Sequence, residues 1–218
     1  MYILLISSSP RKEKSQTFLL AKEVLKGIPS SVKIETIHLC DYKIEFCRHC
    51  ESCHRKIMCC PINDDVNMIL EKMLKAEGVI FATPNYINQI TASMKALWDR
   101  AAHFIHCRRF LGKYVAGVVS SGSGRDRVVL DYIQYYANTC GALYAGGISS
   151  GMPINEEKME GALSLGSKLM LDIQENRVFP EQLKAIEGFK EHFKNVMQMR
   201  KDDWVEEYQY WLDKGWFR

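Results

Sequence analysis

YILLISSSPRKEKSQTFLLAKEVLK, residues 2–26, is the segment from which the architecture can be predicted. Tyr2 to Ile6 is a short, continuous apolar run, which is typical of a strand buried on both faces of a sheet. Polar residues 7–14 interrupt this run, and from Ser15 onward apolar side chains recur at helical spacing until Gly27. The segment therefore predicts a strand, a polar loop and a helix in succession.

Four later segments also have the features of strands, and helical patterns separate them. They span residues 32–39, 78–82, 114–120 and 143–148. Five buried strands separated by helices indicate a parallel sheet covered on both faces. We therefore predict an α/β fold with a flavodoxin-like, doubly wound, five-stranded parallel sheet of order 2-1-3-4-5. We interpret residues 1–218 as one domain, with a cysteine-rich insertion at 46–61 after the second strand and a C-terminal helical extension at about 180–218.

Composition argues against several kinds of partner. The chain has 29 basic and 26 acidic residues, and the basic ones are scattered, so we expect no nucleic acid partner. No apolar run approaches the roughly 18 to 20 residues that span a bilayer, and the start of the chain lacks the features of a secretory signal. We therefore expect a cytoplasmic protein without membrane contact. In a reducing cytosol its eight cysteines indicate ligands, reactive thiols or buried side chains rather than disulfides.

Polar loops follow the first, third and fourth predicted strands, and in a parallel sheet such loops meet at the carboxyl edge, where ligands bind. The first loop places polar groups at a helix N-terminus, which favours a phosphate. The residues are Ser8, Ser9, Arg11, Ser15, Gln16 and Thr17. Because the loop has no glycine-rich dinucleotide motif and no Walker lysine, it indicates FMN rather than a dinucleotide or a nucleoside triphosphate. The alternative is that the serines only cap the helix.

The second and third loops offer contacts to a flat ring. TPNYIN, residues 83–88, presents a tyrosine and two asparagines. SSGSG, residues 120–124, allows close backbone approach at Gly122 and Gly124. Together with the first loop, they favour a flavin site over simple helix capping.

FCRHCESCHRKIMCCP, residues 46–61, contains five of the eight cysteines. Cys47, Cys50 and Cys53 are each separated by two residues, which is the spacing of the first three ligands in bacterial ferredoxins. The pattern therefore favours a 4Fe-4S cubane cluster. The alternative is a zinc site that only ties the loop down, although zinc sites usually combine two separated Cys-x2-Cys pairs.

These motifs occur in an order that resembles a known family. SSPRK with Thr17, TPNYINQITASMKALWDR and VVSSGSG resemble the flavodoxin-like NAD(P)H-dependent FMN reductases over about the first 150 residues. The cysteine segment followed by Asp64 and Asp65 resembles the iron-sulfur flavoproteins within that family. The resemblance implies that the flavin phosphate is bound by Ser9, Arg11, Ser15, Gln16 and Thr17, and the isoalloxazine by Pro84, Asn85, Tyr86, Ile87, Ser121, Gly122, Ser123 and Gly124.

The fourth metal ligand has two candidates. Cys59 gives a gap of five residues after Cys53, whereas Cys60 keeps the distance to Asp64 and Asp65, and relatives show both features. We slightly favour Cys59, so the predicted metal-binding set is Cys47, Cys50 and Cys53 with Cys59 or Cys60.

The resemblance implies an FMN-dependent oxidoreductase that moves electrons between NAD(P)H or ferredoxin, FMN and a cubane cluster. It implies a homodimer or homotetramer, with ferredoxin as a possible redox partner. From the residues themselves we assign no catalytic side chain beyond the cofactors. One alternative is a cluster-free NAD(P)H:FMN or quinone reductase whose cysteines bind zinc or are free. Another is a non-catalytic flavodoxin-type carrier, against which the net charge of +3 argues because such carriers tend to be acidic.

The remaining polar residues are expected to be structural. Asp64 and Asp65 are interpreted as acids that begin a helix, and Asp99 and Arg100 as neighbours with separate contacts. The histidines at 49, 54 and 106 are interpreted as polar loop residues, Cys40 and Cys140 as buried, and Cys107 as a surface or interface residue rather than a nucleophile. The cysteine segment is expected at the same carboxyl edge as the three polar loops.

Overall fold

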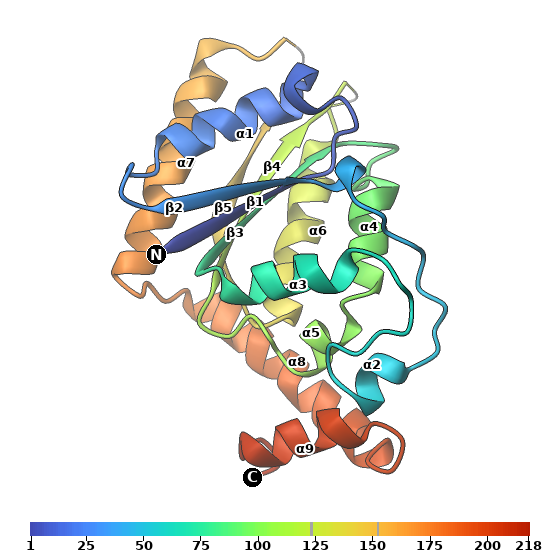
Figure 1. Cartoon of the computed structure of the whole chain (residues 1–218). Coiled ribbons are helices and arrows are strands. Elements are labelled where there is room, and N and C mark those ends of the chain that lie inside the picture. Colours follow the sequence, from blue (N-terminus) through green and yellow to red (C-terminus); the bar gives the residue numbers. More distant parts are fainter. Residues whose placement is uncertain (123, 152) are drawn as a thin grey trace.

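The computed structural model describes residues 1–122, 124–151 and 153–218. Its centre is a sheet of five parallel strands in the order β2-β1-β3-β4-β5 (Figure 1). The strands are β1 (Tyr2–Ser7), β2 (Lys33–His38), β3 (Gly78–Pro84), β4 (Tyr114–Ser120) and β5 (Leu143–Ser150). The predicted fold class is therefore confirmed, and each strand begins within two residues of its predicted start.

Helices connect the strands and continue after the last one. The α-helices are α1 (Gln16–Lys26), α2 (Ser52–Arg55), α3 (Val66–Lys75), α4 (Ala92–Asp99), α5 (Ala102–His106), α6 (Asp126–Thr139), α7 (Glu156–Gln174), α8 (Pro180–Met199) and α9 (Val205–Asp213). Two short 3-10 helices are η1 (Lys12–Lys14) and η2 (Leu39–Asp41). Within the part of the chain that the structure describes, no helix is long and apolar enough to cross a membrane.

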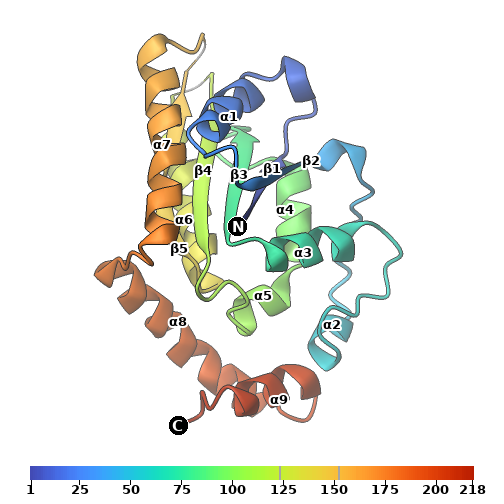
Figure 2. The ribbon, with the colours of Figure 1, turned by 60° about the vertical axis from the view of Figure 1, so that its left-hand side comes forward.

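The helices cover both faces of the sheet (Figure 2). On one face α1 and α7 bury Leu20, Val24 and Leu169 against Ile3 and Leu5 of β1. On the other face α3, α4 and α6 pack against the side chains of alternate positions in the same strands. This two-sided burial explains why the strands have continuous apolar sequences rather than alternating ones.

Residues 90–105 have apolar side chains at the spacing of one helix, but the structure divides them between α4 and α5. Arg100 ends α4, and its N–H is shared between the carbonyls of Ala96 and Trp98. The chain turns at Ala101 and α5 begins one residue later. No proline or glycine marks this break. The turn directs the Arg100 side chain inward and carries α5 toward the C-terminal helices.

The free edge of β5 is joined to α8 by one side chain. The Tyr144 N–H donates to Gln182 Oε1 at 2.6 Å, and Gln182 Nε2 donates to the Tyr144 carbonyl at 2.9 Å. Asn138 of α6 donates to the same Gln182 oxygen at 2.9 Å. These bonds satisfy part of an edge strand, and they fix the start of α8 beside the sheet.

His103 in α5 is a buried histidine that the fold keeps neutral. Its side chain is 1% exposed, and its Nε2 lies 3.1 Å from Met58 Sδ. Burial lowers the pKa of His103 to about 3, although the charge of Glu207 opposes the shift. The unfolded chain therefore binds a proton here at pH values where the folded chain does not.

This histidine predicts a loss of stability on acidification. From pH 7 to pH 5, it should lower the free energy of unfolding by about 2 kcal/mol, because only the unfolded state becomes protonated. Urea unfolding of the wild type and of His103→Gln at both pH values measures the effect. The variant should lose most of this dependence, whereas His192→Gln, at an exposed histidine, should keep it. Equal pH dependence in all three proteins would contradict the prediction.

Candidate functional site

A polar cleft lies at the carboxyl edge of the sheet. It encloses about 170 Å³ and is lined by Ser9, Arg11, Ser15, Gln16, Thr17, Pro84, Asn85, Tyr86, Ser120, Ser121 and Gly122. These residues come from the carboxyl ends of β3 and β4, the loops after β1, β3 and β4, and the start of α1, which the parallel sheet places side by side. The structure therefore brings the three predicted polar loops together.

The first loop ends in a capped helix that opens on the cleft. The Ser15 hydroxyl accepts the Phe18 N–H at 3.4 Å and so caps α1. The Ser9 hydroxyl accepts the Arg11 N–H at 3.4 Å. Free N–H groups and the positive end of the helix dipole make this terminus suited to an anion, and Arg11 adds a guanidinium.

Hydroxyl and amide groups join the loops to each other. Thr17 Oγ1 and Ser120 Oγ are 2.6 Å apart, and both residues are buried. The Asn85 side chain donates to Ser121 Oγ at 3.1 Å, and the Asn85 N–H donates to the Ser120 carbonyl at 2.8 Å. These bonds join all three loops around the cleft.

Tyr86 stands at the rim of the cleft on a tight turn. Tyr86 and Gln89 exchange two backbone hydrogen bonds of 3.0 and 3.1 Å. The two residues between them, Ile87 and Asn88, have φ values of 53° and 60°. The left-handed region is unfavourable for a β-branched residue such as Ile87, so the turn is held in place by its surroundings. The Tyr86 ring is left half exposed.

Most of the residues predicted to contact the flavin line the cleft. Ile87 is 97% exposed, and Ile87 and Gly124 do not line the cleft within the described residues. Ser123 lies outside the residues that the structure describes. Ser120 was not predicted. Its position as the last residue of a buried strand before a polar loop is the signal that could have identified it.

A second cavity, of about 260 Å³, is lined by cysteines. Cys47, Cys50, Cys53 and Cys60 contribute to it together with histidines and charged groups. Cys59 is exposed and, within the described parts of the chain, is not among the lining residues. Four cysteines of the predicted set therefore line one cavity.

The cysteine cavity is not at the carboxyl edge, and the expectation that it lies there was wrong. After η2 the chain continues without regular structure and runs past α3 and α4 to α2, which lies beside α5 and α9 (Figures 1 and 2). This is the amino end of the sheet, because α5 precedes β4. The position of a loop after a strand determines only where the loop begins. The loop after β2 is long enough to leave the carboxyl edge of the sheet.

Asp64 and Asp65 close the base of the cysteine segment. Asp64 Oδ2 accepts the Glu45 N–H at 2.9 Å, and Asp65 Oδ2 accepts the Lys43 N–H at 2.7 Å. Asp64 also forms a buried ion pair with Arg100, with Nη1 and Oδ2 2.6 Å apart. Burial alone would raise the pKa of Asp64, but the bonds from Arg100 and the backbone lower it. The sequence had suggested only that these acids begin α3. In the structure they also bind Arg100 and the backbone of Lys43 and Glu45.

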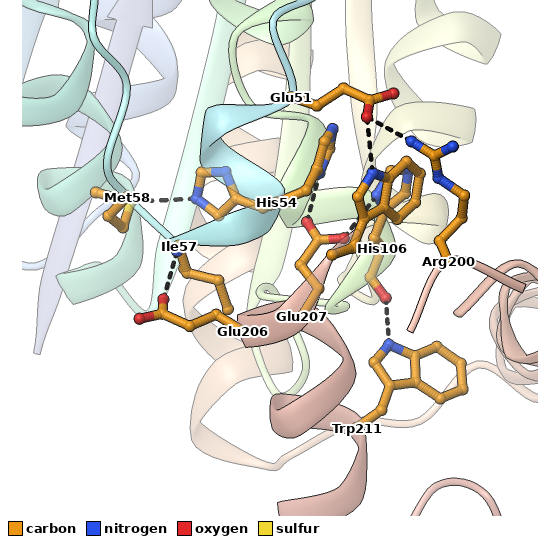
Figure 3. A network of polar contacts seen from close by, with 11 residues as sticks. Glu51, His54, Ile57, Met58, His106, Arg200, Glu206, Glu207 and Trp211 are labelled. Atoms are coloured by element: carbon orange, nitrogen blue, oxygen red, sulfur yellow. Dashed lines mark hydrogen bonds and ion pairs between the residues drawn. The ribbon is translucent and has the colours of Figure 1, made fainter. Parts of the chain in front are cut away.

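A buried carboxylate from the C-terminal extension completes the second site (Figure 3). Glu207 has no exposed surface. Its Oε1 accepts from His54 Nδ1 at 2.8 Å, and its Oε2 accepts from His106 Nδ1 at 3.0 Å. Burial raises the pKa of Glu207, but the two histidines outweigh it and the net shift is downward. Both histidines also line the cysteine cavity.

Further contacts attach the end of α8 and the start of α9 to the cysteine segment. Glu51 binds Arg200 and accepts from Trp204 Nε1 at 3.2 Å. The Ile57 N–H donates to Glu206 Oε2 at 2.6 Å. None of these partners was identified from the sequence, since they lie about 150 residues away and carry no motif.

The individual cysteines differ in environment. Burial, with the negative charges of Glu207, Cys60 and Cys47, raises the pKa of Cys53 to about 12. Burial raises the pKa of Cys107 and of Cys140. Cys140 is buried as expected, but Cys107 is buried and Cys40 is exposed, opposite to both expectations. The apolar neighbours of Cys40 in the sequence belong to η2 and β2, which turn it outward.

A sheet of order 2-1-3-4-5 with a polar cleft at its carboxyl edge defines the flavodoxin-like class. Residues 1–156 match the family model for NADPH-dependent FMN reductases. An iron-sulfur flavoprotein of Archaeoglobus fulgidus is 28% identical over 96% of this chain and 97% of its own length. A second one from that organism is 33% identical over 62% of this chain and 68% of its own.

Solved structures agree with the fold. An apo NADH:FMN oxidoreductase superposes with a TM-score of 0.61 at 20% identity, over 78% of this chain and 89% of its own. The chain belongs to the NADPH-dependent FMN reductase family, in the group whose members are named iron-sulfur flavoproteins. The predicted resemblance is confirmed.

We expect the folded protein to depend on the Glu207 carboxylate for its stability. Glu207→Gln should lower the free energy of unfolding at pH 7 by about 3 kcal/mol, because it breaks a buried charged network that one amide cannot satisfy. Urea unfolding followed by tryptophan fluorescence measures the loss, since three of the four tryptophans lie in residues 204–216. Glu160→Gln, at an exposed acid of α7, is the matched control. Equal stability of the two variants would contradict the prediction.

Proposed function

We propose that this protein is an FMN-dependent oxidoreductase that also holds a 4Fe-4S cluster and moves electrons between NAD(P)H or ferredoxin, FMN and the cluster. The observation that carries the proposal is the presence of two separate built sites, a polar cleft at the carboxyl edge and a four-cysteine cavity at the amino end. FMN would exchange electron pairs with a nicotinamide, and the cluster would exchange single electrons. The side chains bind, orient and tune these groups.

The polar cleft fits FMN. Its anion-binding end is the capped N-terminus of α1 with Arg11 beside it. Its other end has Tyr86 at the rim and Asn85 and Ser121 at the wall. A phosphate and a flat heteroaromatic ring match these two ends, and the family match supports FMN in particular.

The second cavity fits a cluster held by Cys47, Cys50, Cys53 and Cys60. These four residues line one space, and burial, together with the negative charges of Glu207, Cys60 and Cys47, raises the pKa of Cys53. A positively charged metal core would remove that repulsion and is the natural partner of several thiolates. We therefore prefer Cys60 to Cys59 as the fourth ligand, which revises the slight preference drawn from spacing.

We further propose that the protein works as a homodimer or homotetramer, with ferredoxin as a possible redox partner. Ile87 beside the cleft and Phe46 beside the cysteines are 97% and 74% exposed. Exposed apolar side chains next to two redox sites are suited to contact between copies. Such contact would bring the cysteine cavity of one copy near the cleft of another.

Arg11→Ala tests the orientation of FMN. It should weaken FMN binding by about 10- to 100-fold, because one charge-assisted hydrogen bond to phosphate contributes about 1.5 to 3 kcal/mol. Riboflavin, which has no phosphate, should bind the variant and the wild type equally. Flavin fluorescence titration of apo protein measures both affinities. Arg218→Ala, at an exposed arginine outside the cleft, should change neither, and an equal loss for both flavins would refute the phosphate assignment.

Serine substitutions test the metal-binding set. Protein purified without oxygen should contain about four irons per chain and show visible absorption that bleaches with dithionite. Cys60→Ser should lose most of the iron, whereas Cys59→Ser should keep it, because Cys59 lies outside the cavity. Iron analysis and absorption spectra measure the outcome. The reverse pattern would restore Cys59 as the ligand, and zinc without iron would overturn the cluster.

A further inference from the structure

Arg100 and Asp64 form an ion pair in the protein interior, with both side chains 1% exposed. The pair is bidentate, since Nη1 lies 2.6 Å from Oδ2 and Nη2 lies 3.1 Å from Oδ1. Removing two charges from water is costly, and apolar residues often replace such pairs without loss of stability. Stability alone therefore does not account for this pair.

The guanidinium also binds Cys60 and the residue that precedes the cysteine segment. Nη2 donates to Cys60 Sγ at 3.2 Å, and Nη1 donates to the Glu45 carbonyl at 2.9 Å. A guanidinium presents its donors in a rigid plane, so the bidentate bond to Asp64 fixes the direction of the remaining donors. Asp64 therefore orients Arg100, and Arg100 orients the Cys60 sulfur.

The same contact distinguishes two adjacent cysteines. Cys60 is partly buried against Arg100 and lines the cavity, whereas Cys59 is exposed. The spacing of the cysteines in the sequence did not distinguish these two residues. The position of the buried Arg100 guanidinium distinguishes them, because it contacts only Cys60 of the two.

We infer that Arg100, oriented by Asp64, is a positioning residue that presents the Cys60 sulfur to the metal and holds a positive charge against it. The inference rests on the proposed function, since it takes Cys60 as a ligand. A hydrogen bond and a positive charge at a ligand sulfur stabilise the more negative, reduced state of a cluster. Arg100 therefore raises the reduction potential of the site.

Arg100→Lys tests the inference with charge retained, because an ammonium lacks the planar fork that reaches Asp64 and Cys60 together. In iron-loaded protein its midpoint potential should shift to a more negative value. The shift should persist in the Cys59→Ser background. Arg177→Lys, which alters an arginine paired with the buried Asp172 at 3.3 Å outside the cavity, should produce no shift. An unchanged potential in Arg100→Lys would overturn the inference.

A second measurement separates this inference from the proposed function. Co²⁺ is titrated into metal-free protein, and thiolate-to-cobalt absorption reports binding. Arg100→Lys should weaken Co²⁺ binding by about 10- to 100-fold in the wild-type and Cys59→Ser backgrounds, and have little effect once Cys60 is already serine. An equal loss in all backgrounds would refute the coupling of Arg100 to Cys60.

The two results are independent. If purified protein contains no iron but the Co²⁺ cycle shows the coupling, the proposed cluster fails and the role of Arg100 stands. If iron is present and the Co²⁺ cycle shows no coupling, the proposed cluster stands and the role of Arg100 fails. Should Arg100→Lys fail to fold, Asp64→Asn keeps the guanidinium but removes the carboxylate charge and one of the two oxygens that orient it. Asp64→Asn should weaken Co²⁺ binding in the same Cys60-dependent way, and unchanged binding would contradict the inference.

Discussion

Parallel pairing of the five strands is the constraint on which the rest of the structure depends. Because all strands run in one direction, the loops that leave their carboxyl ends meet at one edge. This brings Thr17 within 2.6 Å of Ser120, although 103 residues separate them in the chain. Toward the amino ends of the strands lie α5 and α8, with α9 beyond them, and the cysteine cavity forms beside α5 and α9 (Figures 1 and 2).

The cysteine segment depends on charge rather than on strand pairing. Residues 42–51 have no regular secondary structure, so their backbone groups must find other partners. Asp64, Asp65 and Arg100 bind its base, while Glu206 and Glu207 bind its far side. Buried charges are tolerated here because each has a partner, and the loss of one partner leaves another group uncompensated. The segment is consequently ordered without a sheet.

The sequence predicted what depends on local pattern and missed what depends on distant contacts. Apolar runs such as Tyr2–Ile6 identify buried strands by themselves, and polar residues after them identify the cleft. Two-residue gaps identified three cysteines as one set. However, Glu207 contacts His54 across 153 residues, and nothing in its own neighbourhood marks it as buried. Asp64 was interpreted as a helix-starting acid because such acids are common, and its pairing with Arg100 requires the fold.

The two sites are held apart by α4. Thr91 caps this helix beside the cleft loop and receives support from Thr83, while Arg100 at its other end touches Cys60. Eight helical residues rise about 12 Å, and Trp98 stacks on Tyr136 with 3.8 Å between ring centroids, so α4 is firmly packed. Within one copy the separation is therefore fixed. In the assembly that we propose, the surfaces around Phe46 and Ile87 would set how close the cysteine cavity of one copy comes to the cleft of another.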